Sequence, residues 1–370
     1  MSGEGMSGGM SGGMSGGMVE DLEELVVCES FSSDLAAVAR SAEVVAAMGA
    51  RYLGAPPEKL VIDGVTHLRW AFGSPKVLLL GHHDTVWPMG SLATHPWSVV
   101  DGVARGPGVF DMKAGLVQTF HALAGLDSLD GITVLVTGDE EVGSVTSSPL
   151  IQDTARGLAA AFVMEASADG GALKTARKGT ALYTVNVHGK AAHAGLEPEK
   201  GANAGIELAH QILAISAIGA GATTVTPTLL SGGSAANTVP ASASVAVDVR
   251  VAEVLEQERV DAAMRALRSV VPGTRLEILG GANRPPLEAA MSAPLFAVAQ
   301  ELAAGLGLKP LRSASVGGAS DGNFTAGVGC PTLDGLGAVG GGAHADHEHV
   351  ILAEMPGRTA LLRALINAVR

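Results

Sequence analysis

Cysteine, aromatic side chains and charge are all scarce in this sequence. Its 370 residues include two cysteines, Cys28 and Cys330, so a disulfide framework is excluded and a reducing compartment is expected. Aromatic residues make up 3% of the chain, which argues against aromatic platforms that stack on ligands. Charged residues make up 16% and hydrophobic residues 47%, and this balance predicts a large buried interior.

Long apolar runs and positive charge are also lacking. No stretch reaches about 18 consecutive apolar residues, so we expect no transmembrane helix. The formal net charge of −13 argues against nucleic acids and anionic membrane surfaces as partners. The chain begins with repeats of Met-Ser-Gly-Gly, which have neither the basic nor the apolar part of a secretory signal. We therefore expect a disordered, functionally silent tail over residues 1–18 and a cytoplasmic protein.

The length of the chain favours two domains over one. The pattern of apolar residues changes after position 178 and returns from about position 286. We expect residues 19–178 and 286–370 to form one domain and residues 179–285 to be inserted as a second domain.

One short apolar run ends abruptly in polar side chains. Val77–Leu80 reads as a fully buried strand, and His82 and Asp84 follow it on the same side of the chain. In open α/β sheets ligands bind at the carboxyl ends of the strands. His82 could therefore bind a metal ion with Asp84 fixing its tautomer, although a turn with a satisfied buried histidine has the same pattern.

Two further apolar runs have the same design. Ile132–Thr137 leads into Asp139, Glu140 and Glu141, and Ala159–Met164 ends at Glu165. A solvated loop would explain each acidic ending by itself. Because the ending recurs on three predicted strands, we expect a metal site built from carboxylate and imidazole ligands.

Asp111 introduces a further carboxylate near a helix entrance. It follows the turn Gly106-Pro107-Gly108 and precedes an amphipathic helix predicted over Ala114–Leu123. In isolation this position is typical of a helix N-cap, because exposed N–H groups favour an anion there.

The inserted segment alternates apolar and polar residues in a β-α-β-β-α-β order, which predicts a compact α+β sandwich with one solvent-exposed sheet face. The expected strands are Ala181–Val187, Thr223–Leu229, Ala243–Val251 and Arg275–Leu279, and the expected helices are Asn203–Ile215 and Leu255–Val271. Outside it we expect helices over Val19–Cys28, Ala36–Gly49, Pro294–Ala304 and Ala353–Val369. The last of these should expose Arg358, Arg363 and Arg370.

An ordered set of motifs resembles one known family. The motifs are Gly-His-x-Asp-Thr-Val at 81–86, Gly-Pro-Gly-x-x-Asp-x-Lys at 106–113, Asp-Glu-Glu-x-Gly-Ser at 139–144, Met-Glu-Ala-Ser around Glu165, His-Gly-Lys-Ala-Ala-His-Ala-Gly at 188–195 and Gly-Ala-His-x-x-x-Glu-x-Val at 342–350. They resemble the di-zinc metallopeptidases that include acetylornithine deacetylase, succinyl-diaminopimelate desuccinylase, aminoacylase and glutamate carboxypeptidase, with the last branch most similar. The resemblance implies an α/β catalytic domain with a mostly parallel central sheet and an inserted ferredoxin-like α+β dimerisation domain.

The resemblance also implies a role for each site residue. Two zinc ions would be held by His82, Asp111, Glu141, Glu165 and His344. Asp111 would bridge the ions, with His82 and Glu165 on one and Glu141 and His344 on the other. Glu140 would be the general base and Asp84 would orient His82. His347 is the next candidate if His344 is not the C-terminal ligand, and Co²⁺ or Mn²⁺ could replace zinc.

Substrate contacts are implied for four more residues. In a homodimer, His193 would reach the partner subunit's site and polarise the scissile carbonyl. Arg284 would grip the free carboxylate of the substrate, with help from Asn237 and from backbone N–H groups at Gly318. An ordinary surface histidine, a surface ion pair of Arg284 and turn chemistry at Asn237 are the alternatives.

These expectations together favour a glutamate carboxypeptidase-like exopeptidase that cleaves an amide bond to an amino acid with a free carboxylate. The alternative within enzymes is an N-acyl-amino-acid deacylase, and the two would differ in pocket residues on the acyl side. A catalytically silent binding protein on the same scaffold would have lost Glu140 or a ligand, and all are present.

Overall fold

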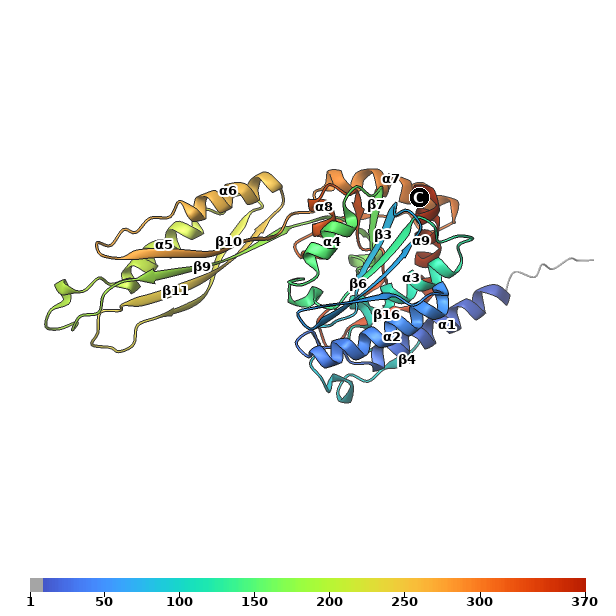
Figure 1. Ribbon diagram of the computed structural model, residues 1–370, viewed down its shortest axis with the longest axis horizontal. Coiled ribbons are helices and arrows are strands. Elements are labelled where there is room, and N and C mark those ends of the chain that lie inside the picture. The colour runs from blue at the N-terminus through green and yellow to red at the C-terminus, as the bar shows by residue number, and fades with distance from the viewer. Residues whose placement is uncertain (1–8) are drawn as a thin grey trace, which may run out of the picture. The chain divides into compact units, whose positions relative to one another are not determined.

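The computed structural model describes residues 9–370, which divide into two compact units (Figure 1). The first unit contains the described residues up to Ala176 together with Ala289–Val316 and Ser320–Arg370. The second unit contains Arg177–Glu288 and Gly317–Ala319. The expected insertion, residues 179–285, falls within the second unit. Residues 1–8 of the expected tail lie outside the described residues.

A six-stranded sheet forms the centre of the first unit, with the strand order β1-β2-β6-β3-β7-β14. The strands are β1 (Glu58–Ile62), β2 (Val65–Phe72), β6 (Ile132–Thr137), β3 (Val77–His82), β7 (Ala160–Val163) and β14 (Thr332–Leu333). The last four are parallel to one another, whereas β2 runs antiparallel to both β1 and β6. The sheet is therefore mostly parallel, as expected.

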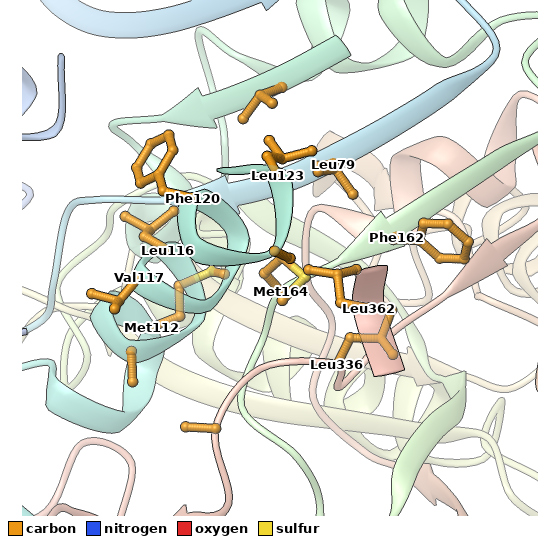
Figure 2. Packing of buried hydrophobic residues seen from close by; sticks show 14 of the residues in the cluster. Leu79, Met112, Leu116, Val117, Phe120, Leu123, Phe162, Met164, Leu336 and Leu362 are labelled. Carbon is orange, nitrogen blue, oxygen red and sulfur yellow. The ribbon is translucent and has the colours of Figure 1, made fainter. Parts of the chain in front are cut away.

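Helices cover both faces of this sheet, which explains the continuous apolar runs of its central strands. Leu79 of β3 packs in the cluster that includes α3, whereas its neighbours Leu78 and Leu80 pack in the cluster of the opposite face. Figure 2 shows the first cluster, in which Phe120 of α3 and Phe162 of β7 are labelled. Successive residues of β3 are thus buried on opposite sides.

The helices of the first unit are α1 (Gly9–Val27), α2 (Leu35–Leu53), α3 (Ala114–Ala124), α4 (Ser148–Ala155), α7 (Ala289–Gly305), α8 (Gly322–Gly327) and α9 (Met355–Val369). The start of α1 corrects the prediction of a disordered tail, because residues 9–18 are helical. Met18 is 1% exposed and belongs to the core cluster. Because α1 is held in the core from Met18 onward, extending it toward Gly9 carries no nucleation cost, although each glycine there disfavours the helix by about 1 kcal/mol.

Two small sheets complete the first unit. One pairs β15 (Gly340–Gly341), β16 (His349–Ile351), β5 (Val103–Arg105) and β4 (Ser98–Val100) in that order. The other pairs β13 (Ser313–Val316) with β8 (Leu173–Arg177). The first sheet brings the C-terminal His-rich segment to the stretch that precedes Asp111.

The second unit is a four-stranded antiparallel sheet with the order β10-β11-β9-β12. Its elements are β9 (Gly179–His188), α5 (Ala204–Ser216), β10 (Thr224–Gly232), β11 (Ser242–Val251), α6 (Val254–Arg265) and β12 (Arg275–Arg284). The alternate residues of β9 and β11 form the unit's core with α5 and α6. This is the expected ferredoxin-like arrangement of strands and helices.

Helix α6 ends earlier than expected, at Arg265 rather than near Val271. The carboxylate of Glu207 accepts the backbone N–H groups of Val270 and Val271 at 2.9 and 2.6 Å. These N–H groups therefore bond to a side chain from α5 instead of to helical carbonyls, so the helix does not continue.

The C-terminal segment corrects a second expectation, because none of Arg358, Arg363 and Arg370 is fully solvent-exposed; Arg370 is half-buried and donates to the carbonyl of Ser128. Arg358 is 6% exposed and donates to the carbonyls of Gly337, Gly171 and Gly335. Arg363 is half-buried and donates to the carbonyls of His121 and Ala122.

Among the residues described, no helix is both long and apolar enough to cross a bilayer.

Candidate metal centre and active site

Three neighbouring strands of the central sheet end at the candidate site. Parallel strands β6, β3 and β7 lie side by side, and β3 is in the middle (Figure 1). His82 is the last residue of β3, Glu140 and Glu141 follow β6, and Glu165 follows β7. After β3 the chain forms β6 on one side of β3 and later β7 on the other side. Ligands of α/β sheets bind at such a switch point.

The carboxylate of Asp111 lies between two imidazoles. His82 Nε2 is 3.4 Å from Asp111 Oδ1, and His344 Nε2 is 3.3 Å from Asp111 Oδ2. Asp111 belongs to the turn Val109–Lys113 and is not the N-cap of α3, whose N-cap is Lys113. Its two oxygens thus face two different histidines, which is the arrangement expected of a carboxylate that bridges two metal ions.

Each histidine has a further carboxylate beside it. His82 Nε2 is 3.6 Å from Glu165 Oε1, and His344 Nε2 is 3.2 Å from Glu141 Oε2. Two ligand atoms bonded at about 2.0–2.2 Å to one tetrahedral zinc ion lie roughly 3.3–3.6 Å apart. The four separations, which run from 3.2 to 3.6 Å, are therefore close to those of ligand pairs around a common ion.

Unsatisfied buried atoms support the same fit. His82 Nε2, Asp111 Oδ1 and Glu141 Oε1 are buried, and no atom of the described residues forms a hydrogen bond with them. Leaving such atoms unpaired costs about 1–3 kcal/mol each, so buried polar atoms usually have a partner. Imidazole nitrogen and carboxylate oxygen are the donor set that zinc and related divalent ions accept. The residues present fit a pair of such ions.

Glu140 is the fourth carboxylate at the centre. Its ligand oxygen, His82 and an oxygen of Glu165 all lie within 4.8 Å of one another. Glu140 is 8% exposed, so its carboxylate is largely shielded from solvent beside these ligand atoms. The position suits either a ligand or a general base.

The crowded charges alter the proton affinities of these groups. Burial opposes the charge on His82, but contacts with Asp111, Asp84 and Glu165 raise its pKa well above the ordinary value. Contacts with Asp111 and Glu141 raise the pKa of His344 to about 10. Burial favours the neutral form of Asp111, yet its contacts with His344 and His82 hold its pKa far below the usual range. A divalent cation would supply the same compensation for the acids.

The Asp84 side chain links the segment after β3 to the segment after β6. Its carboxylate accepts hydrogen bonds from the backbone N–H groups of Glu140 and Glu141, both at 3.2 Å, and from the hydroxyl of Ser32 at 2.7 Å. Its Oδ1 atom lies 3.5 Å from Nδ1 of His82, and the nearer partner of that nitrogen is the Asp84 carbonyl at 3.0 Å. The Asp84 carboxylate therefore holds the loop of Glu140 and Glu141 and lies beside the ring of His82.

His344, rather than His347, faces the carboxylates of the centre. Among the described residues, the His347 side chain forms no ion pair, whereas His344 lies beside both Asp111 and Glu141. His344 has a φ of 63°, a left-handed conformation that is uncommon for a residue with a side chain. Such conformations are often found at functional sites.

Two charged residues near the centre, Glu348 and Lys174, were not predicted from the sequence to have a role there. Glu348 is 3% exposed and accepts three backbone N–H groups from the turn that carries Asp111. Lys174 Nζ lies 3.6 Å from Glu165 Oε2. Neither residue follows a predicted buried strand, so neither had the pattern that singled out the ligands.

The remaining predicted residues belong to the second unit. His193 and Asn237 lie on adjacent segments, joined by a hydrogen bond from the Ala194 N–H to the Asn237 carbonyl at 2.9 Å. Arg284 is 8% exposed at the end of β12. Gly318 is exposed, and its carbonyl accepts a hydrogen bond from Arg177 at 3.2 Å.

A comparison with protein-family models now decides the family. The model described as "Peptidase family M20/M25/M40" matches residues 78–368. The chain belongs to this peptidase family. The match spans the second unit, the residues of the candidate centre and all of the central sheet that follows Val77, so the chain is a metallopeptidase-type hydrolase of the M20 group.

Similar proteins agree with this assignment. Carboxypeptidase G2 of Pseudomonas sp. (strain RS-16) is 32% identical over 374 residues, covering 94% of this chain and 88% of the relative. A succinyl-diaminopimelate desuccinylase of Methylorubrum populi is 28% identical and covers 80% of this chain and 82% of the relative. A Bacillus subtilis structure described as a dinuclear metal-binding M20 peptidase has a TM-score of 0.66 at 13% identity, over 97% of this chain and 99% of that chain. The two relatives support peptidase or deacylase chemistry, and the structural likeness supports the fold.

Proposed function

We propose that this M20 protein is a zinc-dependent exopeptidase that cleaves an amide bond to an amino acid with a free carboxylate, as a glutamate carboxypeptidase would. The observation that carries the proposal is the Asp111 carboxylate, which has His82 on one oxygen and His344 on the other. The 32% identical relative named carboxypeptidase G2 supports the choice of substrate class.

Two Zn²⁺ ions would be held by the residues around Asp111. His82 and Glu165 would hold one ion, Glu141 and His344 the other, and Asp111 both; Co²⁺ or Mn²⁺ could substitute. When bound, such ions polarise a carbonyl and lower the pKa of a water molecule. The chain itself contributes fixed ligands, because Asp84 and Glu348 hold the loops that carry Glu141 and Asp111.

Glu140 would be the general base of the reaction. It would take a proton from the attacking water and later deliver a proton to the leaving nitrogen. Its backbone N–H bonds to Asp84 at 3.2 Å, which fixes the start of its side chain. With His82 and Glu165 nearby, the carboxylate is positioned among the candidate ligands.

His193 would stabilise the negative charge that develops on the scissile carbonyl oxygen. Its Nδ1 atom accepts the backbone N–H groups of Gly195 and Leu196, both at 3.1 Å. A neutral ring then carries its proton on Nε2, which can donate a hydrogen bond. We propose that the second unit dimerises and that His193 acts on the partner subunit's substrate.

Arg284 would bind the free carboxylate of the substrate, with Asn237 and the Gly318 backbone assisting. A guanidinium binds a carboxylate through two parallel hydrogen bonds. Arg284 is 8% exposed, and burial strengthens such a contact.

We also propose a cytoplasmic location, because the free thiols of Cys28 and Cys330 suit a reducing compartment.

A deacylase is the second candidate, and the desuccinylase relative at 28% identity favours it. Such an enzyme would accept an acyl chain where the exopeptidase accepts a peptide. The metal centre and the contact with the free carboxylate would be the same in both.

A substrate panel tests the proposal. Zinc-loaded protein should hydrolyse dipeptides and N-acyl amino acids with C-terminal glutamate, and blocking the glutamate α-carboxylate as its amide should abolish turnover. Chelation should remove the activity and zinc should restore it. Preferred cleavage of N-succinyl substrates would select the deacylase. No hydrolysis of any member by fully loaded protein would contradict both candidates.

A further inference from the structure

A cavity of about 270 Å³ lies in the first unit beside the start of α9. Its walls come from the segment Leu308–Arg312, the turn at Gly170 and Gly171, and residues of α9. None of the side chains of the candidate metal centre lines it. It is therefore a separate space within the same unit.

Arg358 places a buried positive charge at this cavity. The residue is 6% exposed, and its three nitrogens donate to the carbonyls of Gly337, Gly171 and Gly335. A guanidinium has five N–H donors, so these contacts leave two of them. Within the described residues no carboxylate lies within ion-pair distance of Arg358, although Glu354 is near enough to act on its charge.

A buried cation without a counter-ion is unfavourable, and the lowered pKa of Arg358 reflects this cost. Burial lowers the pKa of Arg358 to about 10. Buried charges in proteins are normally paired with an opposite charge, because desolvation costs several kcal/mol per ion. An anion in the cavity would supply the missing partner.

The rim of the cavity is also cationic. Arg312 and Lys309 line it, and Glu354 is the acidic residue among its lining residues. The Glu354 carboxylate pairs with Lys309 at 3.0 Å, and in the part of the chain that the structure describes Arg312 donates only to the carbonyls of Asp169 and Gly170. The lining therefore keeps an excess of positive charge.

The remaining walls are apolar. Leu308, Leu311, Val339 and Leu361 contribute aliphatic surface. An apolar cavity of about 150 Å³ accommodates benzene, so the space here is large enough for a chain of about six carbons. We propose that this cavity binds a small organic anion, with a carboxylate directed at Arg358 and Arg312 and a short aliphatic tail against the leucines.

The location connects such a ligand to the metal centre through the backbone. Val339 precedes β15 and Ile351 ends β16, and the segment between these two strands carries His344. Arg358 also holds the carbonyls of Gly335 and Gly337. An occupied cavity would thus restrict the segments on which His344 depends.

Calorimetric titration of the full chain with hexanoate tests this site, with hexanamide as the neutral ligand of the same shape. We expect saturable binding of one hexanoate and no binding of hexanamide. Binding should persist after the metal ions are chelated, which separates this cavity from carboxylate binding at the metal centre. The proposal does not depend on the proposed reaction, so failure of one leaves the other standing.

Matched variants locate the binding. Leu308→Trp should fill the cavity from its half-buried edge and abolish hexanoate binding. Leu306→Trp, at a 43% exposed position outside the cavity, should leave binding unchanged. Arg312→Gln should weaken binding by about tenfold, as expected for one charge-assisted hydrogen bond. No hexanoate binding to the unaltered protein, loss of binding on chelation, or equal binding to Leu308→Trp would overturn the proposal.

Discussion

The carboxylate of Glu348 accepts the backbone N–H of Asp111 at 3.0 Å. The same side chain accepts the N–H groups of Phe110 and Gly108 at 2.8 and 3.0 Å and the indole N–H of Trp87 at 2.7 Å. One buried acid thus binds the whole turn that places Asp111 between the two histidines. Interactions behind a ligand commonly matter almost as much as the ligand itself.

Replacing Glu348 with glutamine should weaken metal binding. The amide keeps one acceptor oxygen but turns an NH₂ group toward backbone donors, so the turn of Asp111 loses part of its support. We expect metal affinity to fall by about 10–100-fold, the usual effect of losing such a partner. Competition with a chromophoric chelator measures this directly.

Glu354→Gln is the matched control for this substitution, because its carboxylate pairs with exposed Lys309 and contacts no part of the centre. Equal metal affinity in the two variants would show that Glu348 does not support the centre. Circular dichroism of both variants should remain that of the unaltered protein.

Glu140→Gln should separate catalysis from metal binding. If Glu140 is the base, the variant loses proton transfer and kcat falls by about 10²–10⁴-fold. The amide cannot accept the proton, but the five ligands remain, so two ions per chain should still be found by elemental analysis. Loss of one ion together with activity would instead identify Glu140 as a ligand, which its place beside His82 and Glu165 also permits.

His67 should make the fold sensitive to acid. This residue is fully buried, and its ring bonds to the Gly138 N–H at 3.2 Å and to the Thr146 hydroxyl at 2.9 Å. Burial lowers its pKa below the ordinary 6.5. Below pH 6.5 His67 is therefore protonated in the unfolded chain but stays neutral in the folded chain. The free energy of unfolding consequently falls as pH falls toward the folded-state pKa.

The slope of this loss approaches about 1.4 kcal/mol per pH unit for one histidine. His67→Gln should reduce it, whereas His210→Gln, at an exposed position, should not. Urea unfolding of metal-free protein between pH 7 and pH 5 measures the slope without a contribution from metal release. Identical slopes in all three proteins would refute the assignment.

Gly115→Ala should destabilise the first unit even though alanine is the better helix former. A Cβ at position 115 of α3 would lie 2.0 Å from the carbonyl oxygen of Met164, next to Glu165. The helix must move away from the end of β7, which typically costs about 1–3 kcal/mol. In Gly305→Ala of α7, the new Cβ lies within 4 Å of no atom in the described residues, so this variant should be neutral or slightly stabilising. Urea unfolding compares the two.

Much of the central sheet could be predicted from the sequence. The strand Ile132–Thr137 was expected with the bounds that β6 has, because a parallel strand buried on both faces is a continuous apolar run. The polar endings of β3, β6 and β7 could be found for the same reason. The pairing order that makes these three strands neighbours depends on contacts between distant segments, which no local pattern encodes.

Other features had no local signal. The end of α6 depends on Glu207 of α5, and the burial of Arg358 depends on carbonyls at Gly171, Gly335 and Gly337. Both were mispredicted because an arginine or a helical residue looks the same in sequence whether its partner is water or a distant backbone group.

The sequence by itself determined which side chains are available for chemistry, since imidazole and carboxylate groups at the ends of apolar strands can be recognised by residue type and period alone. Only the tertiary structure decided that Asp111 stands between His82 and His344 and that Glu348 secures it there. The reason is physical: residue type follows from the chain, but the few ångströms that separate ligands depend on how segments more than 200 residues apart pack together.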